Sequence, residues 1–113
     1  MNIEDKIRVI KILLNKSGVC RLSVLVDLAS LNKDTDLAGV VLSRIKSDGP
    51  DDLSYFNFSN SDLSNSDLRH CDLTGANFTD ANLTNTDLEG CTLINTVFKN
   101  TILRNTNFKD TVF

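Results

Sequence analysis

The sequence contains few of the residue types from which most catalytic and metal-binding sites are built. Its 113 residues include one histidine, His70, and three cysteines, an odd number that fits no disulfide framework. No Ser/His/Asp arrangement, glycine-rich phosphate loop or cluster of metal ligands is present in the sequence. We therefore expect no enzymatic activity, no catalytic residues, no cofactor and no bound metal.

Long apolar segments and targeting signals are also missing. No apolar run is long enough to span a membrane, and the charged N-terminus lacks the pattern of a signal peptide. The sequence therefore predicts a cytoplasmic protein that has no membrane partner.

The second half of the chain has an apolar residue at every fifth position. On a helix these residues would wind around the cylinder, and on a straight strand alternate ones would point to opposite faces. They can all point inward only if the chain turns a corner within each repeat. We call these residues the centres: Leu53, Phe58, Leu63, Leu68, Leu73, Phe78, Leu83, Leu88, Leu93, Phe98, Leu103, Phe108 and Phe113.

The positions around each centre agree with a chain that turns corners. The second residue after a centre is Asn, Asp or Gly in ten of twelve repeats, and these residues tolerate a positive φ. The residue two before a centre is small from Ser61 onward and should point inward, because strand side chains alternate. The residue directly before a centre is mostly Asp or Asn in the earlier repeats and should face water.

Individual repeats resemble a known family. The pentapeptides at 61–65, 71–75, 76–80 and 81–85 read Ser-Asp-Leu-Ser-Asn, Cys-Asp-Leu-Thr-Gly, Ala-Asn-Phe-Thr-Asp and Ala-Asn-Leu-Thr-Asn. They are similar to the consensus Ala-(Asp/Asn)-Leu-X-X of the pentapeptide repeat family. The resemblance implies a right-handed quadrilateral β-helix with four pentapeptides per turn. The 20-residue spacings of Phe58, Phe78 and Phe98, and of Cys71 and Cys91, agree with four sides, because like residues would then stack.

The first 49 residues have a different pattern. Apolar residues at helical spacing predict three helices, over about 3–16, 21–31 and 36–46, and the only proline, Pro50, lies in a segment that breaks this pattern. The predicted fold class is α+β: a helical bundle at 1–49, followed by a β-helix of about three coils at 50–113. We expect the bundle to cap or dock on the first coil through Tyr55, Phe56 and Phe58, which would protect the unpaired edge of that coil.

The β-helix has two candidate interaction surfaces. Outward positions near the C-terminus are apolar, and the resemblance implies dimerisation at this end. We expect a homodimer interface that contains Ile94, Val97, Ile102, Val112 and Phe113. The earlier coils are acidic, since residues 51–113 carry nine Asp and Glu against four Lys and Arg. The expected acidic face consists of Asp52, Asp62, Asp67, Asp72 and Asp87, on a wet wall unlike the setting of catalytic carboxylates.

Three functions fit the sequence. A non-enzymatic interaction or scaffold module, which presents rigid faces to a protein partner, is favoured. The resemblance also suggests a DNA-mimic regulator that binds a type II topoisomerase through its acidic coils. The third is nucleic-acid binding by a helix-turn-helix-like N-terminal domain with 36–46 as the recognition helix. Residues 1–50 carry only eight Lys and Arg against six Asp and Glu, which is a weak charge for phosphate contacts and makes nucleic acid an unfavoured partner.

Overall fold

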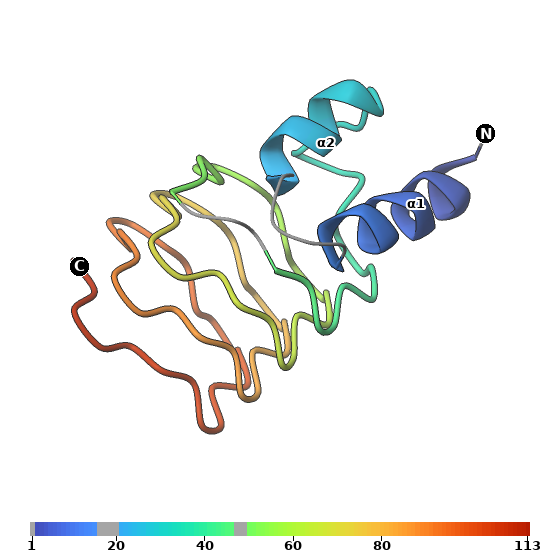
Figure 1. Cartoon of the computed structure of the whole chain (residues 1–113). Coiled ribbons are helices and arrows are strands. Elements are labelled where there is room, and N and C mark those ends of the chain that lie inside the picture. The colour runs from blue at the N-terminus through green and yellow to red at the C-terminus, as the bar shows by residue number, and fades with distance from the viewer. Residues whose placement is uncertain (1, 16–20, 47–49) are drawn as a thin grey trace.

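The computed structural model describes residues 2–15, 21–46 and 50–113, and it has two helices at one end of a coiled tube (Figure 1). Helix α1 spans Ile3–Asn15 and helix α2 spans Leu22–Leu28. In the described chain the β-structure consists of isolated parallel bridges, with corners between them. Neither helix is long and apolar enough to cross a membrane.

The tube has four walls, because the chain meets itself again after four pentapeptides. From Asp52 onward each bridged residue pairs in parallel with the residue 20 positions later. The bridged residues form wall 1 (Asp52, Asp72, Thr92, Val112), wall 2 (Asn57, Asn77, Val97), wall 3 (Val41, Asp62, Asn82, Ile102) and wall 4 (Lys46, Asp67, Asp87, Asn107). Asp52 therefore stacks over Asp72, and Asp67 over Asp87.

Each corner is built by its own pentapeptide. The second residue after every centre from Leu53 to Phe108 has a positive φ, which confirms the predicted corner position. The Asp or Asn before a centre accepts hydrogen bonds from the residue after it: Asp72 Oδ1 lies 3.0 Å from the amide nitrogen and 2.6 Å from the hydroxyl of Thr74. Asn77 and Asn82 repeat this arrangement. The local sequence Asp/Asn-Leu-Ser/Thr therefore encodes the turn.

The interior of the tube is filled by stacked centres. The rings of Phe58 and Phe78 are stacked with centroids 5.3 Å apart, and Phe98 continues the stack at 5.6 Å from Phe78. The small inward residues also fill this core, and their polar atoms are satisfied. For example, the Thr86 hydroxyl donates to the Leu63 carbonyl of the preceding coil at 2.7 Å.

The third helix predicted over 36–46 is wrong. Val41 and Lys46 form parallel bridges with Asp62 and Asp67, so this segment is an additional part of the first coil and not a helix. Gly39 and Arg44 occupy corner positions with φ of 71° and 62°. The helix-turn-helix interpretation consequently lacks its recognition helix.

The error has a physical cause in the register. Leu37 and Leu42 keep the five-residue spacing of centres and both are fully buried. The bridges from this segment, however, span 21 residues, whereas the later bridges span 20. One additional residue between Leu42 and Leu53 therefore interrupts the five-residue spacing of the centres. Parallel pairing begins at Val41, upstream of residue 50, where the sequence placed the domain boundary.

The loop after α2 covers the top of wall 2. The carbonyl of Lys33 accepts a hydrogen bond from the Asn57 amide at 2.9 Å, and the carbonyl of Asp34 accepts one from the Asn57 side chain at 3.0 Å. Gly39 donates its amide to the Ser59 carbonyl at 2.8 Å. These bonds occupy edge groups of the first coil that would otherwise invite pairing with another chain.

Candidate interaction surfaces

The last coil exposes apolar side chains at its open end. Among the five residues predicted to form the dimer interface, the exposed fraction ranges from 42% at Ile94 to 75% at Phe113. The centre Leu103, which the sequence placed inside, is also 38% exposed. We call this set the coil-end surface: Ile94, Val97, Ile102, Leu103, Val112 and Phe113. Within the described chain no further coil lies beyond it, so the amides of Phe98, Leu103 and Phe108 have no hydrogen-bond partner there.

Val97 and Ile102 in the last coil also lack the hydrogen bond that shapes most corners from Asp52 onward. Val97, Ile102 and Val112 stand where earlier coils have mostly Asp or Asn, and an aliphatic side chain cannot accept an amide hydrogen bond. Asn107 keeps the bond, since its Oδ1 accepts the Lys109 amide at 3.0 Å. The apolar residues at these positions therefore do not serve local turn formation.

The three residues predicted to dock the helical segment have different environments. Phe56 is 5% exposed and belongs to the same buried cluster as Leu25 and Val26 of α2. Phe58 is fully buried, with its ring centroid 5.6 Å from that of Phe56. Tyr55 is 63% exposed, and its ring lies across Gly75 in the coil below.

Sequence reasoning missed a contact between Asp51 and helix α2. The Asp51 carboxylate is 3% exposed and accepts hydrogen bonds from the Ser23 hydroxyl and, at 3.2 Å, from the Ser23 amide. The N-cap residue Arg21 makes no capping hydrogen bond with its own side chain. Because an aspartate 28 positions away supplies the acceptor, no capping motif in the local sequence could reveal it.

The predicted acidic residues do not form one face. Asp52 and Asp72 lie on wall 1, Asp62 lies on wall 3, and Asp67 and Asp87 lie on wall 4. These five aspartates are therefore divided among three of the four walls.

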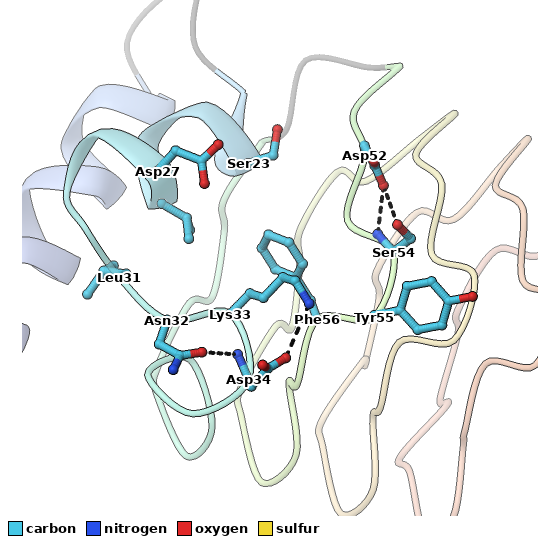
Figure 2. A pocket seen from close by; sticks show the side chains of 11 residues that line it. Ser23, Asp27, Leu31, Asn32, Lys33, Asp34, Asp52, Ser54, Tyr55 and Phe56 are labelled. Atoms are coloured by element: carbon cyan, nitrogen blue, oxygen red, sulfur yellow. Dashed lines mark hydrogen bonds and ion pairs between the residues drawn. The ribbon is translucent and has the colours of Figure 1, made fainter.

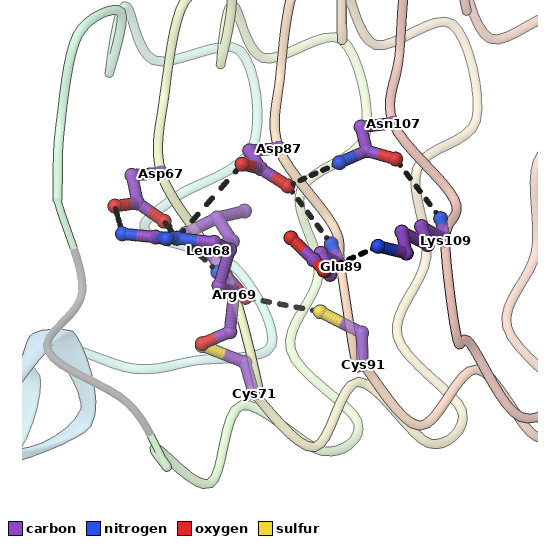
Figure 3. Close-up of polar contacts among 9 residues, drawn as sticks. All are labelled: Asp67, Leu68, Arg69, Cys71, Asp87, Glu89, Cys91, Asn107 and Lys109. Atoms are coloured by element: carbon purple, nitrogen blue, oxygen red, sulfur yellow. Dashed lines mark hydrogen bonds and ion pairs between the residues drawn. The ribbon is translucent and has the colours of Figure 1, made fainter.

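Wall 4 carries a ladder of alternating charges (Figure 3). The Arg69 guanidinium contacts both carboxylate oxygens of Asp67, at 2.9 and 3.0 Å, and lies 3.8 Å from Asp87 on the next coil. Lys109 lies 3.8 Å from Glu89 in the same ladder. Positive side chains thus neutralise part of the wall that the sequence predicted to be acidic.

The contact between Asp67 and Arg69 changes the pKa of both groups. Burial raises the pKa of Asp67, but the hydrogen bonds from the side chain and amide of Arg69, together with the charges of Arg69 and Lys46, outweigh burial and hold this pKa below its usual value. The hydrogen bond that Arg69 donates to Asp67, in turn, raises the pKa of the Arg69 guanidinium. Both groups are therefore ionised at neutral pH.

The two cysteines of the repeat, Cys71 and Cys91, are buried and contribute to the core. The Cys91 thiol donates to the Leu68 carbonyl at 3.0 Å, and burial raises the pKa of Cys91 to about 11. In the described chain, no group of three or more His, Cys, Asp or Glu residues could hold a metal ion. Cys20 lies outside the described residues.

Comparison with known proteins identifies the architecture. The model of the family "Pentapeptide repeats (8 copies)" matches residues 52–80 and 81–113, which is more than half of the chain. The chain therefore belongs to the pentapeptide repeat family, whose members form right-handed quadrilateral β-helices and are generally non-enzymatic structural or interaction modules. No curated protein matches the chain.

Solved pentapeptide repeat proteins are similar to parts of the chain. Rfr23 from the cyanobacterium Cyanothece 51142 is 25% identical over 65% of this chain and 58% of its own, with a TM-score of 0.33. The protein alr5209 from Nostoc PCC 7120 is 19% identical over 80% of this chain and 78% of its own, with a TM-score of 0.25. HetL from Nostoc sp. strain PCC 7120, described as involved in heterocyst differentiation regulation, is 19% identical over 66% of this chain and 47% of its own, with a TM-score of 0.25. The chain thus covers little more than half of Rfr23 and less than half of HetL.

Proposed function

We propose that the protein is a non-enzymatic interaction module that forms a homodimer through its coil-end surface and presents the walls of its β-helix to a protein partner. The observation that carries this proposal is the exchange of turn-forming Asp and Asn for Val97, Ile102 and Val112 in the last coil. Val97 and Ile102 give up a local hydrogen bond, and all three residues expose apolar area to water, which a second copy would bury.

Within the described residues, the last coil also has backbone groups that pair with no other coil. Backbone amides of the last centres point where a further coil would lie, and an exposed edge of this kind pairs readily with another chain. Two identical ends related by a two-fold axis would bury both the edge and the surrounding apolar side chains. At the other end the loop after α2 already occupies edge groups of the first coil.

No comparable observation supports a DNA-mimic function. The aspartates predicted to form one acidic face are divided among walls, and Arg69 and Lys109 pair with carboxylates on wall 4. A topoisomerase partner remains a prediction of the sequence resemblance. An assay of gyrase supercoiling at high excess of the protein would test it.

The homodimer is tested by light scattering coupled to size-exclusion chromatography across a range of protein concentrations. Wild-type protein should have twice the monomer mass. Ile102→Asp should raise the dissociation constant of the dimer roughly thirtyfold, because it places a charge in an interface where a central residue contributes about 2 kcal/mol. Aspartate at this position can accept the Arg104 amide as Asp62 accepts that of Ser64, so folding should be retained.

Val41→Asp is the matched control. Val41 is 57% exposed on the same wall 3 as Ile102, but it lies on the first coil. This variant should remain dimeric. A monomeric wild-type protein at all concentrations, or equal dissociation by both variants, contradicts the proposed coil-end dimer.

A further inference from the structure

A cavity of about 580 Å³ lies where helix α2 and the loop after it meet the first coil (Figure 2). Its volume is in the range of sites that hold small ligands or single anchoring side chains. Three segments distant in sequence form its walls: α2, residues 31–34 and residues 52–56. It is at the opposite end of the molecule from the coil-end surface (Figure 1).

The floor of the cavity is apolar. Val26 and Phe56 line it with exposed fractions of 2% and 5%, and Leu31 adjoins them with 8%. The ring of Phe56 lies in the middle of the labelled residues in Figure 2, between the α2 side and the coil side. This floor can pack against an aliphatic stem but offers it no hydrogen bonds.

The rim of the cavity is mainly acidic. It carries the carboxylates of Asp27, Asp34 and Asp52, and only Lys33 opposes them. Lys33 pairs with Asp34 at 3.2 Å, so its charge is already partly used. Among the described residues, the Asp27 carboxylate has no ion-pair or hydrogen-bond partner.

Asp52 is held in its ionised form on the coil side of the rim. Its Oδ1 accepts the Ser54 hydroxyl at 2.5 Å and the Ser54 amide at 3.0 Å, and these bonds lower the pKa of Asp52. In Figure 2, Asp27 and Asp52 lie on opposite sides of the Phe56 ring. A ligand on that ring would therefore have negative charge on two sides.

We propose that this cavity binds an organic cation, a guanidinium or ammonium group on a short aliphatic stem. The stem would pack on Phe56 and Val26, and the cationic head would lie near Asp27 and Asp52. Such a group can belong to an arginine or lysine side chain of a protein partner or to a free small molecule. If the cation belongs to a protein partner, this proposal rests on the proposed function and specifies that the partner presents an arginine or lysine side chain. Because this site is remote from the coil-end surface, cation binding and dimerisation can fail separately.

The proposal is tested by nuclear magnetic resonance titration of the full chain labelled with ¹⁵N. N-acetyl-arginine amide should produce saturable shifts at the amides of Ser23, Lys33, Ser54 and Tyr55, with a dissociation constant in the millimolar range expected for so small a ligand. N-acetyl-citrulline amide has nearly the same shape without the charge and should produce no saturable shift.

Matched variants locate the site. Asp27→Asn and Asp52→Asn should each weaken binding at least threefold, and asparagine at 52 can still accept the Ser54 bonds. Asp62→Asn is the control, because Asp62 makes the same type of turn bond with Ser64 on wall 3, outside the cavity. Absence of saturable shifts, equal shifts with the citrulline probe, or equal weakening by Asp62→Asn overturns the proposal.

A third probe distinguishes the two sources of the cation. n-Butylguanidine carries the same single guanidinium charge on an aliphatic stem without a peptide backbone. Binding at least tenfold tighter than that of N-acetyl-arginine amide would assign the site to a free small cation. Any smaller difference, or weaker binding, would assign it to the side chain of a protein partner.

Discussion

The carboxylate of Asp51, at the start of the regular β-helix, caps the first turn of helix α2 by accepting hydrogen bonds from Ser23. Helix α2 has seven residues and no capping side chain of its own at Arg21. A helix this short is unstable alone, so its position depends on tertiary contacts. The bond between Asp51 and Ser23 is therefore a specific link between the helical segment and the coils.

Removing this link should destabilise the protein. Asp51→Ala leaves the partly buried amide and hydroxyl of Ser23 without their acceptor, and we expect a loss of about 1–2 kcal/mol in the free energy of unfolding. Asp51→Asn keeps an acceptor oxygen and should cost less. Urea unfolding of both variants, of Ser23→Ala and of the double variant Asp51→Ala/Ser23→Ala measures the effect. Additive losses in the double variant would contradict a direct interaction.

Gly75 should tolerate alanine less well than Gly39 does. Both glycines have a positive φ, 68° and 71°, which costs a residue with a side chain about 1–2 kcal/mol. A Cβ at Gly75 would also lie 2.5 Å from the ring of Tyr55, whereas a Cβ at Gly39 would have no atom within 4 Å. Urea unfolding should therefore give a larger loss for Gly75→Ala.

Two further measurements identify the ring as the cause of that difference. In a Tyr55→Asn background the additional loss at Gly75 should vanish, because asparagine is the usual residue at these corners. Tyr55 is the only tyrosine in a chain without tryptophan, so its fluorescence anisotropy should fall in Gly75→Ala as the ring leaves its position. Equal losses at Gly39 and Gly75 would show that only φ matters.

The contact between Asp67 and Arg69 should make stability depend on pH. The pKa of Asp67 is lowered in the folded protein, so its contribution is complete above the ordinary value of 3.8 and is lost as the pH falls through the lowered folded value. Asp67→Asn should therefore cost up to about 1 kcal/mol at pH 7, and this difference from wild type should shrink toward pH 3. Urea unfolding at pH 7, 4 and 3 measures it, with the exposed corner variant Asp80→Asn as control. A difference that stays constant over this range would contradict the ionic origin.

Cys91 should resist alkylation in the folded protein. With a pKa of about 11 instead of 9.0, its thiolate fraction at pH 8 is lower by roughly a hundredfold, and burial slows access further. Iodoacetamide treatment at pH 8, followed by mass spectrometry of the peptides, should find Cys91 modified only after the protein is unfolded in urea. Rapid modification of Cys91 in native protein would contradict the buried position.

Most features of the repeated half follow from its sequence because each pentapeptide carries its own turn. Asp72 and Thr74 make the hydrogen bonds of one corner within three residues, so corner positions, inward centres and the 20-residue stacking of Phe58 and Phe78 were all predictable. The segment 36–46 was not. Its apolar residues also fit helical spacing, and one additional residue before Leu53 shifts them out of the five-residue count.

The sequence by itself thus determined that the chain turns a corner in every pentapeptide with its centre facing inward, because the information for each corner is local. Only the tertiary structure decided which segments lie above one another. That arrangement places Asp51 in contact with Ser23 of α2. It also divides the five predicted acidic residues among three walls and forms the cavity from three distant segments. It also leaves Leu103 exposed, since burial of a centre requires a coil on each side. These features depend on contacts between residues 20 or more positions apart, which no local pattern records.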